Sequence, residues 1–448
     1  MPDRSFDGRR RVIIEGVSPT VDDGRFPAKR VVGDVAQIEA DIFADGHDVL
    51  SAVMLHRHQS ESKMRQTRMT PLVNDRWRAS FPIEVLGTYF FMIEAWVDHF
   101  LTWHRDLQKR DAADAAVQLK IGAEMIRAAS SRANARDRKR LEHFIATIEG
   151  DEELADKLHD LRSDELLDLM WRNADRSNAT RLECDYAIDA DRARAGFSTW
   201  YELFPRSFGN LRGVEAELPR IAKMGFDVLY LPPIHPIGRK FRKGRNNVVN
   251  AGPHDVGSPW AIGSAEGGHK AIAPQLGTFD DFRRLIDAAK SNDIEIALDI
   301  AFQTSPDHPY VAKHEEWFLK RPDGTIQYAE NPPKKYQDIY PFYFESSAWR
   351  DLWHELRDVI LFWIDNGVRI FRVDNPHTKP LPFWHWAIGE IKKKHPDIIF
   401  LAEAFTRPKI MYWLAKAGFS QSYTYFAWRN TKYELTEYFS AITKPPPA

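Results

Sequence analysis

Three segments that read as hydrophobic strands end in a carboxylate. Asp299 follows the run IEIAL, Asp374 lies in FRVDN, and Glu403 lies in FLAEAF. An ionised acid at the end of an apolar strand is costly to bury unless a cation or hydrogen-bond donors accompany it. A single such acid is readily explained as a structural ion pair, for instance Asp374 with Arg372. Three of them at corresponding strand ends instead predict a functional site.

Asp374 and Glu403 are expected to face each other across one end of a sheet, since parallel strands end at the same edge. Glycosyl transfer needs such a pair, because one carboxylate must act as an ionised nucleophile and the other must hold a proton. Asp299 is expected to order the end of the sheet and not to react. The chemistry indicated by these residues alone is therefore the making and breaking of glycosidic bonds.

The elements that must position these acids alternate between strand and helix from residue 196 onward. About six strand–helix units are expected, which predicts a parallel sheet with crossover helices. The best fit is an α/β fold of the (β/α)8 TIM-barrel type, here incomplete, since polar residues gather after the strands, where barrel active sites lie. A doubly wound open sheet is the alternative, but no G-x-G-x-x-G follows the first strand. The expected strands are residues 197–208, 226–238, 294–303, 368–375, 398–405 and 420–428.

The chain before the barrel has two segments with different sequence patterns. Short alternating and β-branched segments up to residue 105 favour an N-terminal β-sandwich. The following stretch lacks proline and has apolar residues at helical spacing, which predicts a small helical insert. The predicted organisation is a sandwich at 1–110, the insert at 111–178, a return strand and linker at 179–195, and the barrel at 196–448 with a loop subdomain at about 305–345.

Composition excludes several classes of function. The 62 basic and 64 acidic residues give a net charge of −2, so there is no electrostatic signature for nucleic acid or an anionic membrane. The single cysteine, Cys184, excludes an intramolecular disulfide. The N-terminus is charged where a signal peptide would be apolar, and no apolar run approaches the roughly 20 residues of a membrane span. A cytoplasmic location is expected, with no partner among nucleic acids or membranes.

The histidines do not predict a metal site. They are scattered, without the spacing of metal ligands, and are expected to serve as hydrogen-bond partners in loops. No metal and no cofactor is therefore expected. The histidines considered are His235, His254, His269, His308 and His377.

The motifs resemble those of a known enzyme family. FRVDN and FLAEAF, with LYLPPIHPIG and LDIAFQTSPDHP before them, resemble the α-amylase superfamily (glycoside hydrolase family 13). The segments FRKGRNN, GGHKAIAPQLGT, SPDHP, KYQDIYP and FRVDNPHTKP resemble its α-1,4-glucan:maltose-1-phosphate maltosyltransferase family more closely. The resemblance covers nearly the whole chain. It implies retaining transfer of maltosyl units from α-maltose 1-phosphate to the non-reducing end of an α-1,4-glucan, with release of phosphate, by a homodimeric enzyme.

The resemblance also implies a role for individual residues. Asp374 matches the nucleophile that forms a β-glycosyl-enzyme intermediate, and Glu403 matches the general acid/base. Arg372, two residues before the nucleophile, would keep Asp374 ionised. The remaining matches are to positions that bind the donor substrate, with Tyr336 near them: Lys243, Gln303, Asp338 and Asn375. Lys243 taken alone, in the basic run RKFRKGR, would read as a solvated loop residue.

One part of the superfamily pattern is missing from the 448 residues. The third carboxylate, an Asp after the seventh strand, is not found, and neither are a seventh and eighth strand. The chain is therefore expected to be C-terminally truncated and inactive alone. Two alternatives remain open: an α-glucan hydrolase or branching enzyme of the same superfamily, and a non-catalytic glucan-binding fragment.

Overall fold

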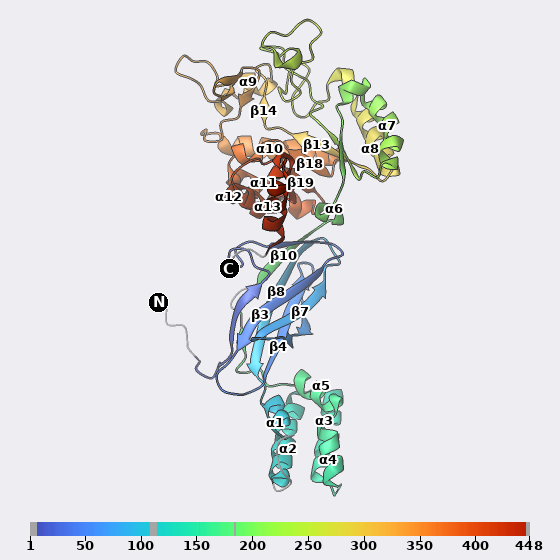
Figure 1. Ribbon diagram of the computed structural model, residues 1–448, viewed down its shortest axis with the longest axis vertical. Coiled ribbons are helices and arrows are strands. Elements are labelled where there is room, and N and C mark those ends of the chain that lie inside the picture. The colour runs from blue at the N-terminus through green and yellow to red at the C-terminus, as the bar shows by residue number, and fades with distance from the viewer. Residues whose placement is uncertain (1–6, 108–113, 152, 183–184, 445–448) are drawn as a thin grey trace. The chain divides into compact units, whose positions relative to one another are not determined.

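The computed structural model describes residues 7–107, 114–151, 153–182 and 185–444 (Figure 1). Cys184 and the predicted boundary at 110/111 lie outside these residues. The chain divides into two compact units, residues 1–190 and 191–448.

Two β-sheets form the centre of the first unit. Side chains alternate between exposed and buried along their strands, and the buried ones (Ile38, Ile42, Phe91 and Ile93 among them) share one apolar core, as in a sandwich. One sheet has the order β1 (Ile13–Ser18), β3 (Val35–Phe43), β7 (Arg76–Pro82) and β6 (Thr70–Pro71). The other has the order β2 (Ala28–Val31), β10 (Tyr186–Asp191), β8 (Gly87–Val97), β4 (Leu50–His58) and β5 (Arg65–Arg68), with β9 (Thr180–Arg181) also on β8.

In the described part of the chain between β8 and β9, five helices are present (Figure 1). Their buried apolar side chains form a core of their own. The chain leaves the sheet after β8 and returns to it through β9 and β10, which both pair antiparallel with β8. The helices are thus inserted between strands of one sheet. They are α1 (His99–Leu107), α2 (Ala115–Arg132), α3 (Ala135–Glu149), α4 (Leu154–Leu161) and α5 (Asp164–Arg172).

The second unit is built on a parallel sheet whose strands follow one another in sequence order. Sequential order without a reversal is the arrangement of a curled barrel sheet and excludes the doubly wound alternative, in which the strand order reverses at a switch point. The strands are β11 (Trp200–Glu202), β12 (Val228–Leu231), β13 (Glu295–Ile300), β18 (Ile370–Val373), β19 (Ile399–Ala402) and β20 (Gln421–Ser422).

Helices lie between and beside these strands, and the longer ones between β11 and β20 bury apolar side chains in the core that they share with the sheet. The helix that follows β12 and its loop begins with a capping box formed by Thr278 and Asp281. The helix after β20 has no buried residue. The helices are α6 (Ala193–Gly196), α7 (Leu211–Lys223), α8 (Phe279–Ser291), α9 (Pro309–Lys313), α10 (Trp349–Asp365), α11 (Leu381–Lys394), α12 (Pro408–Lys416) and α13 (Lys432–Thr443).

Long loops after β12 and β13 carry only short elements. Two small antiparallel pairs lie there, β14 (Gln303–Thr304) with β17 (Tyr340–Pro341), and β15 (Ala329–Asn331) with β16 (Lys334–Tyr336).

The strands expected from sequence are shorter in the structure. The two prolines after Leu231 end β12, because proline cannot donate to a sheet ladder. The expected strand at 420–428 is wrong over most of its length: only Gln421–Ser422 pair, and Tyr425–Trp428 form a 3₁₀ turn. Thr424 accepts a hydrogen bond from the Phe426 N–H, which starts that turn in place of a strand.

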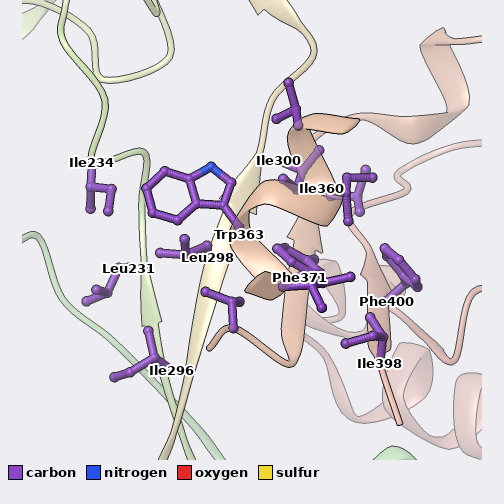
Figure 2. Close-up of a cluster of buried hydrophobic side chains, with 14 of the residues drawn as sticks. Leu231, Ile234, Ile296, Leu298, Ile300, Ile360, Trp363, Phe371, Ile398 and Phe400 are labelled. Carbon is purple, nitrogen blue, oxygen red and sulfur yellow. The ribbon is translucent and has the colours of Figure 1, made fainter. Parts of the chain in front are cut away.

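Apolar side chains fill the space between the sheet and its helices (Figure 2). β12, β18 and β19 are buried throughout, as expected of parallel strands covered on both faces. Trp363 of α10 packs here with Leu298 and Phe371 and has no exposed surface. Its Nε1 donates to the carbonyl oxygen of His269 at 2.8 Å, so the core is tied to the loop after β12.

We expect Trp363→Ala to lower the unfolding free energy of the second unit by about 3–5 kcal/mol, the usual cost of truncating a fully buried aromatic residue. Urea unfolding followed by circular dichroism measures the change. Trp428→Ala is the matched control, since Trp428 is 63% exposed and its loss should change stability by no more than about 0.5 kcal/mol. Equal effects of the two substitutions would contradict the packing described.

Candidate active site

Arg372 lies at the centre of a buried ion network. Its Nη1 is 2.8 Å from Oδ2 of Asp299 and 3.0 Å from Oδ1 of Asp374, and its Nη2 is 3.1 Å from Oε1 of Glu403. The side chains of Arg372, Asp299, Asp374 and Glu403 are exposed by only 9, 0, 11 and 17%. The three acids therefore meet at one cation. The sequence predicts the pairing of Arg372 with Asp374, and the contacts of Arg372 with Asp299 and Glu403 are added by the structure.

Strand register brings these residues together. Asp299 of β13 and Arg372 of β18 are direct neighbours across the parallel pair. Asp374 and Glu403 each follow the last residue of a strand, and their N–H groups continue the ladder by donating to the carbonyl oxygens of Ile300 and Val373. Arg372 and Asp374 are two residues apart, so their side chains leave the same face of β18.

Asp299 is held by two donors on one oxygen. The hydroxyl of Tyr230 in β12 donates to Oδ2 at 2.5 Å, and Arg372 donates to the same atom. Complete burial raises the pKa of Asp299 to about 7; Arg372 opposes this shift, and the charge of Asp374 adds to it. Burial raises the pKa of Tyr230 as well, so that its hydroxyl remains a donor.

Arg372 is held from both sides. The rings of Tyr230 and Tyr423 lie 5.6 and 5.8 Å from its guanidinium carbon, within the range of cation–π contact. Burial alone would lower the pKa of Arg372, but Asp299, Tyr230, Glu403 and Asp374 together raise it. The two tyrosines also line a cavity of about 570 Å³ between β11 and β20. The guanidinium thus stays charged in a fixed place.

Glu403 is biased toward its protonated form. Burial raises the pKa of Glu403, Arg372 lowers it, and the charge of Asp374 raises it further. The backbone N–H of Asn375 donates to Oε2 at 3.2 Å. A carboxyl group that keeps a proton beside a carboxylate is what a general acid requires.

A cavity of about 670 Å³ opens beside Asp374. Four of the residues predicted from sequence line it: Gln303, Tyr336, Asp374 and Asn375. Its other walls include residues 327–331, Thr378, Lys379 and the rings of Phe302, Phe342 and Phe344. Polar groups on a partly aromatic wall suit a ligand that carries both hydroxyl groups and apolar faces, as sugars do.

Lys243 and Asp338 lie next to this cavity but not on its described wall. Lys243 is 7% exposed and donates to Oε1 of Gln337 at 3.1 Å, and Gln337 follows Tyr336 in the chain. Asp338 is 2% exposed, and its Oδ1 is buried without a hydrogen-bond partner in the described structure. Burial raises the pKa of Asp338, while a backbone hydrogen bond and Lys243 oppose that shift. Lys243 is thus not the solvated residue that its basic run alone indicates.

Two residues of this site, Tyr230 and Lys379, are not among those predicted from the sequence. Tyr230 lies inside the apolar run LYLPPI, which indicates a residue packed in the core. Lys379 lies inside DNPHTKP, which indicates a loop. Lys379 lines the cavity, and its Nζ lies 3.3 Å from the carbonyl oxygens of both Asp374 and Asn375.

The structure shows neither a metal centre nor a membrane span in the residues it describes. In residues 7–107, 114–151, 153–182 and 185–444, no three His, Cys, Asp or Glu side chains gather as metal ligands would. No described helix is both long enough and apolar enough to cross a bilayer.

Two buried histidines tie the loop that carries Gln303 to the rest of the site. Nε2 of His269 lies 3.0 Å from the carbonyl oxygen of Ala301, and Nδ1 of His308 accepts from the Tyr310 N–H. Nδ1 of His269 and Nε2 of His308 are 3.1 Å apart. Because His269 must donate to Ala301, its Nδ1 accepts and Nε2 of His308 donates, so both rings are neutral with defined tautomers.

Glycine is required where the chain passes this histidine pair. A Cβ atom at Gly268 would lie 2.1 Å from Nε2 of His308, and one at Gly263 would lie 2.2 Å from the same ring. Gly263 also has a φ of +108°. The buried rings thus fit only because the loop after β12 lacks side chains at these two places.

We expect these histidines to make stability fall in mild acid. Burial lowers the pKa of His269 to about 4, of His235 to about 3 and of His308 to about 2, from an ordinary 6.5. Below pH 6.5 these histidines therefore bind protons in the unfolded chain but stay neutral in the folded chain. Protonation thus favours the unfolded state, and the unfolding free energy decreases as pH falls from 6.5 toward 4. Each such histidine contributes up to about 1.4 kcal/mol per pH unit.

Denaturant unfolding between pH 5 and 7 checks this expectation. His308→Asn keeps a good helix N-cap but removes one buried imidazole, so it should lower stability at pH 7 and flatten the pH dependence. His254→Asn, at an exposed histidine, is the control and should leave the slope unchanged. A slope that His308→Asn does not alter would count against the arrangement.

Comparison with known proteins places the chain. The family model "Alpha-1,4-glucan:maltose-1-phosphate maltosyltransferase, domain N/S" matches residues 10–192, and "Alpha amylase, catalytic domain" matches residues 172–433. The maltosyltransferase of Chlorobaculum tepidum is 51% identical over 99% of this chain and 67% of its own length. The chain belongs to the α-1,4-glucan:maltose-1-phosphate maltosyltransferase family. The resemblance inferred from the motifs is confirmed.

Other relatives agree with that family. The maltosyltransferase of Methylacidiphilum infernorum is 51% identical over 98% of this chain and 67% of its own length. The chain thus spans about two thirds of the length of these curated relatives. A solved α-amylase from Lactobacillus plantarum is 29% identical, with a TM-score of 0.44, over 55% of this chain and 60% of its own. Maltosyltransferases are glycosyltransferases of the α-amylase superfamily, so the chain comes from an enzyme family with a barrel-type catalytic domain.

Proposed function

We propose that the protein transfers maltosyl units from α-maltose 1-phosphate to the non-reducing end of an α-1,4-glucan, with retention of configuration and release of phosphate. The observation that carries the proposal is the joint attachment of Asp374 and Glu403 to Arg372, at the edge of a cavity lined by Gln303 and Asn375. The family supplies the identity of donor and acceptor.

In the first step Asp374 attacks the anomeric carbon of the donor. The bond from that carbon to the phosphate oxygen breaks, its electron pair leaves with the phosphate, and Glu403 gives the leaving oxygen a proton. A β-glycosyl ester of Asp374 results. In the second step the acceptor 4-hydroxyl attacks the same carbon, Glu403 takes its proton, and the Asp374 carboxylate leaves. Two inversions give net retention.

The surrounding residues support each step electrostatically. Arg372 stabilises the negative charge of Asp374 and, by its bond to Glu403, keeps the acid at a fixed distance from the nucleophile. Asn375 and Gln303 offer amide N–H groups, and Lys243 offers a cation, for the donor phosphate. Tyr336 and Asp338 suit sugar hydroxyl groups. The unpartnered, buried Oδ1 of Asp338 supports this, because it is an acceptor that a hydroxyl would satisfy.

We expect Asp374→Asn and Glu403→Gln each to lower the rate of phosphate release by about 10²–10⁴-fold or more, because each removes a group that the chemical step requires. The measurement is phosphate released from maltose 1-phosphate by the purified full-length enzyme with a maltooligosaccharide acceptor. Glu390→Gln is the control, since Glu390 pairs on the surface with Lys393. Reducing sugar released without phosphate would refute the transfer proposal and favour a hydrolase.

The family also supports proposals about organisation. We propose the division into a sandwich at 1–110, a helical insert at 111–178, a return strand and linker at 179–195 and the barrel at 196–448, with a loop subdomain at about 305–345. The boundary between two compact units after residue 190 supports the separation of the barrel from the preceding part. We further propose that the protein is a cytoplasmic homodimer. Light scattering of the purified full-length enzyme should give twice the subunit mass at micromolar concentration; a monomer at that concentration would refute the dimer.

A further inference from the structure

We propose that Lys379 is a positioning residue for the transfer reaction: its ammonium group holds the left-handed turn that sets Asp374, Asn375 and Glu403 relative to one another. The inference rests on the proposed function, because the test measures the rate of that reaction. The contacts that support it are those of the nucleophile and the acid, not those of the phosphate-binding residues. It is carried by the backbone contacts of one turn.

The turn begins directly after β18. Asn375 has φ 42° and ψ 54°, in the left-handed region that non-glycine residues rarely occupy. Asparagine tolerates this conformation better than most residues do, but a surrounding structure must still enforce it. The residue at this bend follows the nucleophile, so any relaxation of the bend moves Asp374.

Lys379 reaches back over the bend to its two carbonyl groups. Its Nζ lies 3.3 Å from the oxygen of Asp374 and 3.3 Å from the oxygen of Asn375. Thr378 secures only the second of these, with its hydroxyl at 2.8 Å and its N–H at 3.1 Å from the oxygen of Asn375. In the described chain Lys379 is therefore the side chain that joins the carbonyl groups on both sides of the bend.

At the bend, two N–H groups of Asn375 each lie near a carboxylate oxygen. The Asn375 N–H points to Oε2 of Glu403 at 3.2 Å, and the Asn375 side-chain amide lies 3.4 Å from Oδ1 of Asp374. An ordinary right-handed or extended φ at Asn375 would swing its side-chain amide and its carbonyl group about the N–Cα bond, away from Asp374 and Lys379. The conformation of one residue thus couples the nucleophile, the acid and an amide on the cavity wall.

The charges around Lys379 favour a cation there. Three carboxylates face it, those of Asp299, Asp374 and Glu403, and all three oppose the lowering of its pKa that burial causes. Arg372 offsets the charge of one of these carboxylates. Other titratable groups near the cluster are His377, Tyr230 and Tyr423. Without Lys379 a single cation would face three acids, which would raise the pKa of Glu403 further.

The test compares Lys379→Met, which keeps length but loses charge and donors, with Lys379→Arg, which keeps both. In the full-length enzyme we expect Lys379→Met to lower kcat about 100-fold. The KM for the donor should change less than threefold, because a misplaced nucleophile slows the reaction but does not weaken binding. The alkaline limb of the kcat–pH profile should move to higher pH in Lys379→Met and stay in place in Lys379→Arg. The kcat of Lys379→Arg should lie within about tenfold of that of the natural enzyme. Lys394→Met, at an exposed lysine, should change nothing.

A double-variant cycle isolates the turn. Glycine adopts the left-handed conformation freely, so Lys379→Met should cost less in kcat when added to Asn375→Gly than when added to the natural chain. Equal cost in both backgrounds would overturn the proposal. So would an increase in KM at unchanged kcat, which would make Lys379 a ligand of the donor, and so would a kcat within threefold of the natural enzyme.

Folding and function are separated by two further measurements. Thermal unfolding shows whether each variant folds. If Lys379→Met does not fold, Lys379→Gln takes its place, with the same expected loss of kcat and the same shift of the alkaline limb to higher pH. If the natural enzyme hydrolyses glucans but releases no phosphate from maltose 1-phosphate, the proposed function fails. The Lys379 comparison then runs on that hydrolysis, and unchanged rates there would overturn this inference on its own.

Discussion

One buried guanidinium makes the rest of the site possible. Arg372 contacts Asp299, Asp374 and Glu403, and three carboxylates so deeply buried could not lie this close together without it. Burying charges carries a desolvation cost that only good geometry repays. That geometry comes from the parallel ladder of β13, β18 and β19, whose register places Asp299 beside Arg372 and lets Asp374 and Glu403 continue the ladder at the strand ends. The sheet is therefore both scaffold and electrostatic frame.

The loops add what the sheet cannot supply. Gln303 of β14 and Tyr336 of β16 both come from the long loop after β13, and the pairing of β14 with β17 returns the chain beyond Tyr336 to the side of Gln303. The loop after β12 packs against this loop, where the Ser305 N–H and hydroxyl donate to the carbonyl oxygens of Ile262 and Gly263. The histidine pair His269 and His308 joins those loops, and Trp363 joins one of them to the core through the His269 carbonyl. The part of the cavity wall that lies on loops is thus tied to a rigid core by directional bonds between neutral groups.

Burial decides the protonation of the site more than any single charge does. It is the largest cause of the raised pKa values of Asp299 and Glu403, and of the lowered values of His235, His269 and His308. The same low polarity that holds the histidines neutral helps Glu403 to keep a proton beside Asp374. The loss of stability in acid and the raised pKa of Glu403 are thus two consequences of the same dry interior.

The sequence by itself determined the alternation of strand and helix, the three carboxylates at strand ends, the pairing of Asp374 with Arg372, and the family, whereas the contacts of Asp299 and Glu403 with Arg372 came from the structure. It could do so because strand period, strand order and motif spacing are local properties, and parallel strands bring their ends to one edge. Only the tertiary structure decided the bond from Tyr230 to Asp299, the burial of Lys243, the tautomers of His269 and His308, and the place of Lys379 over the turn at Asn375. These depend on distances between segments tens of residues apart, on burial, and on one residue's backbone conformation, none of which spacing encodes.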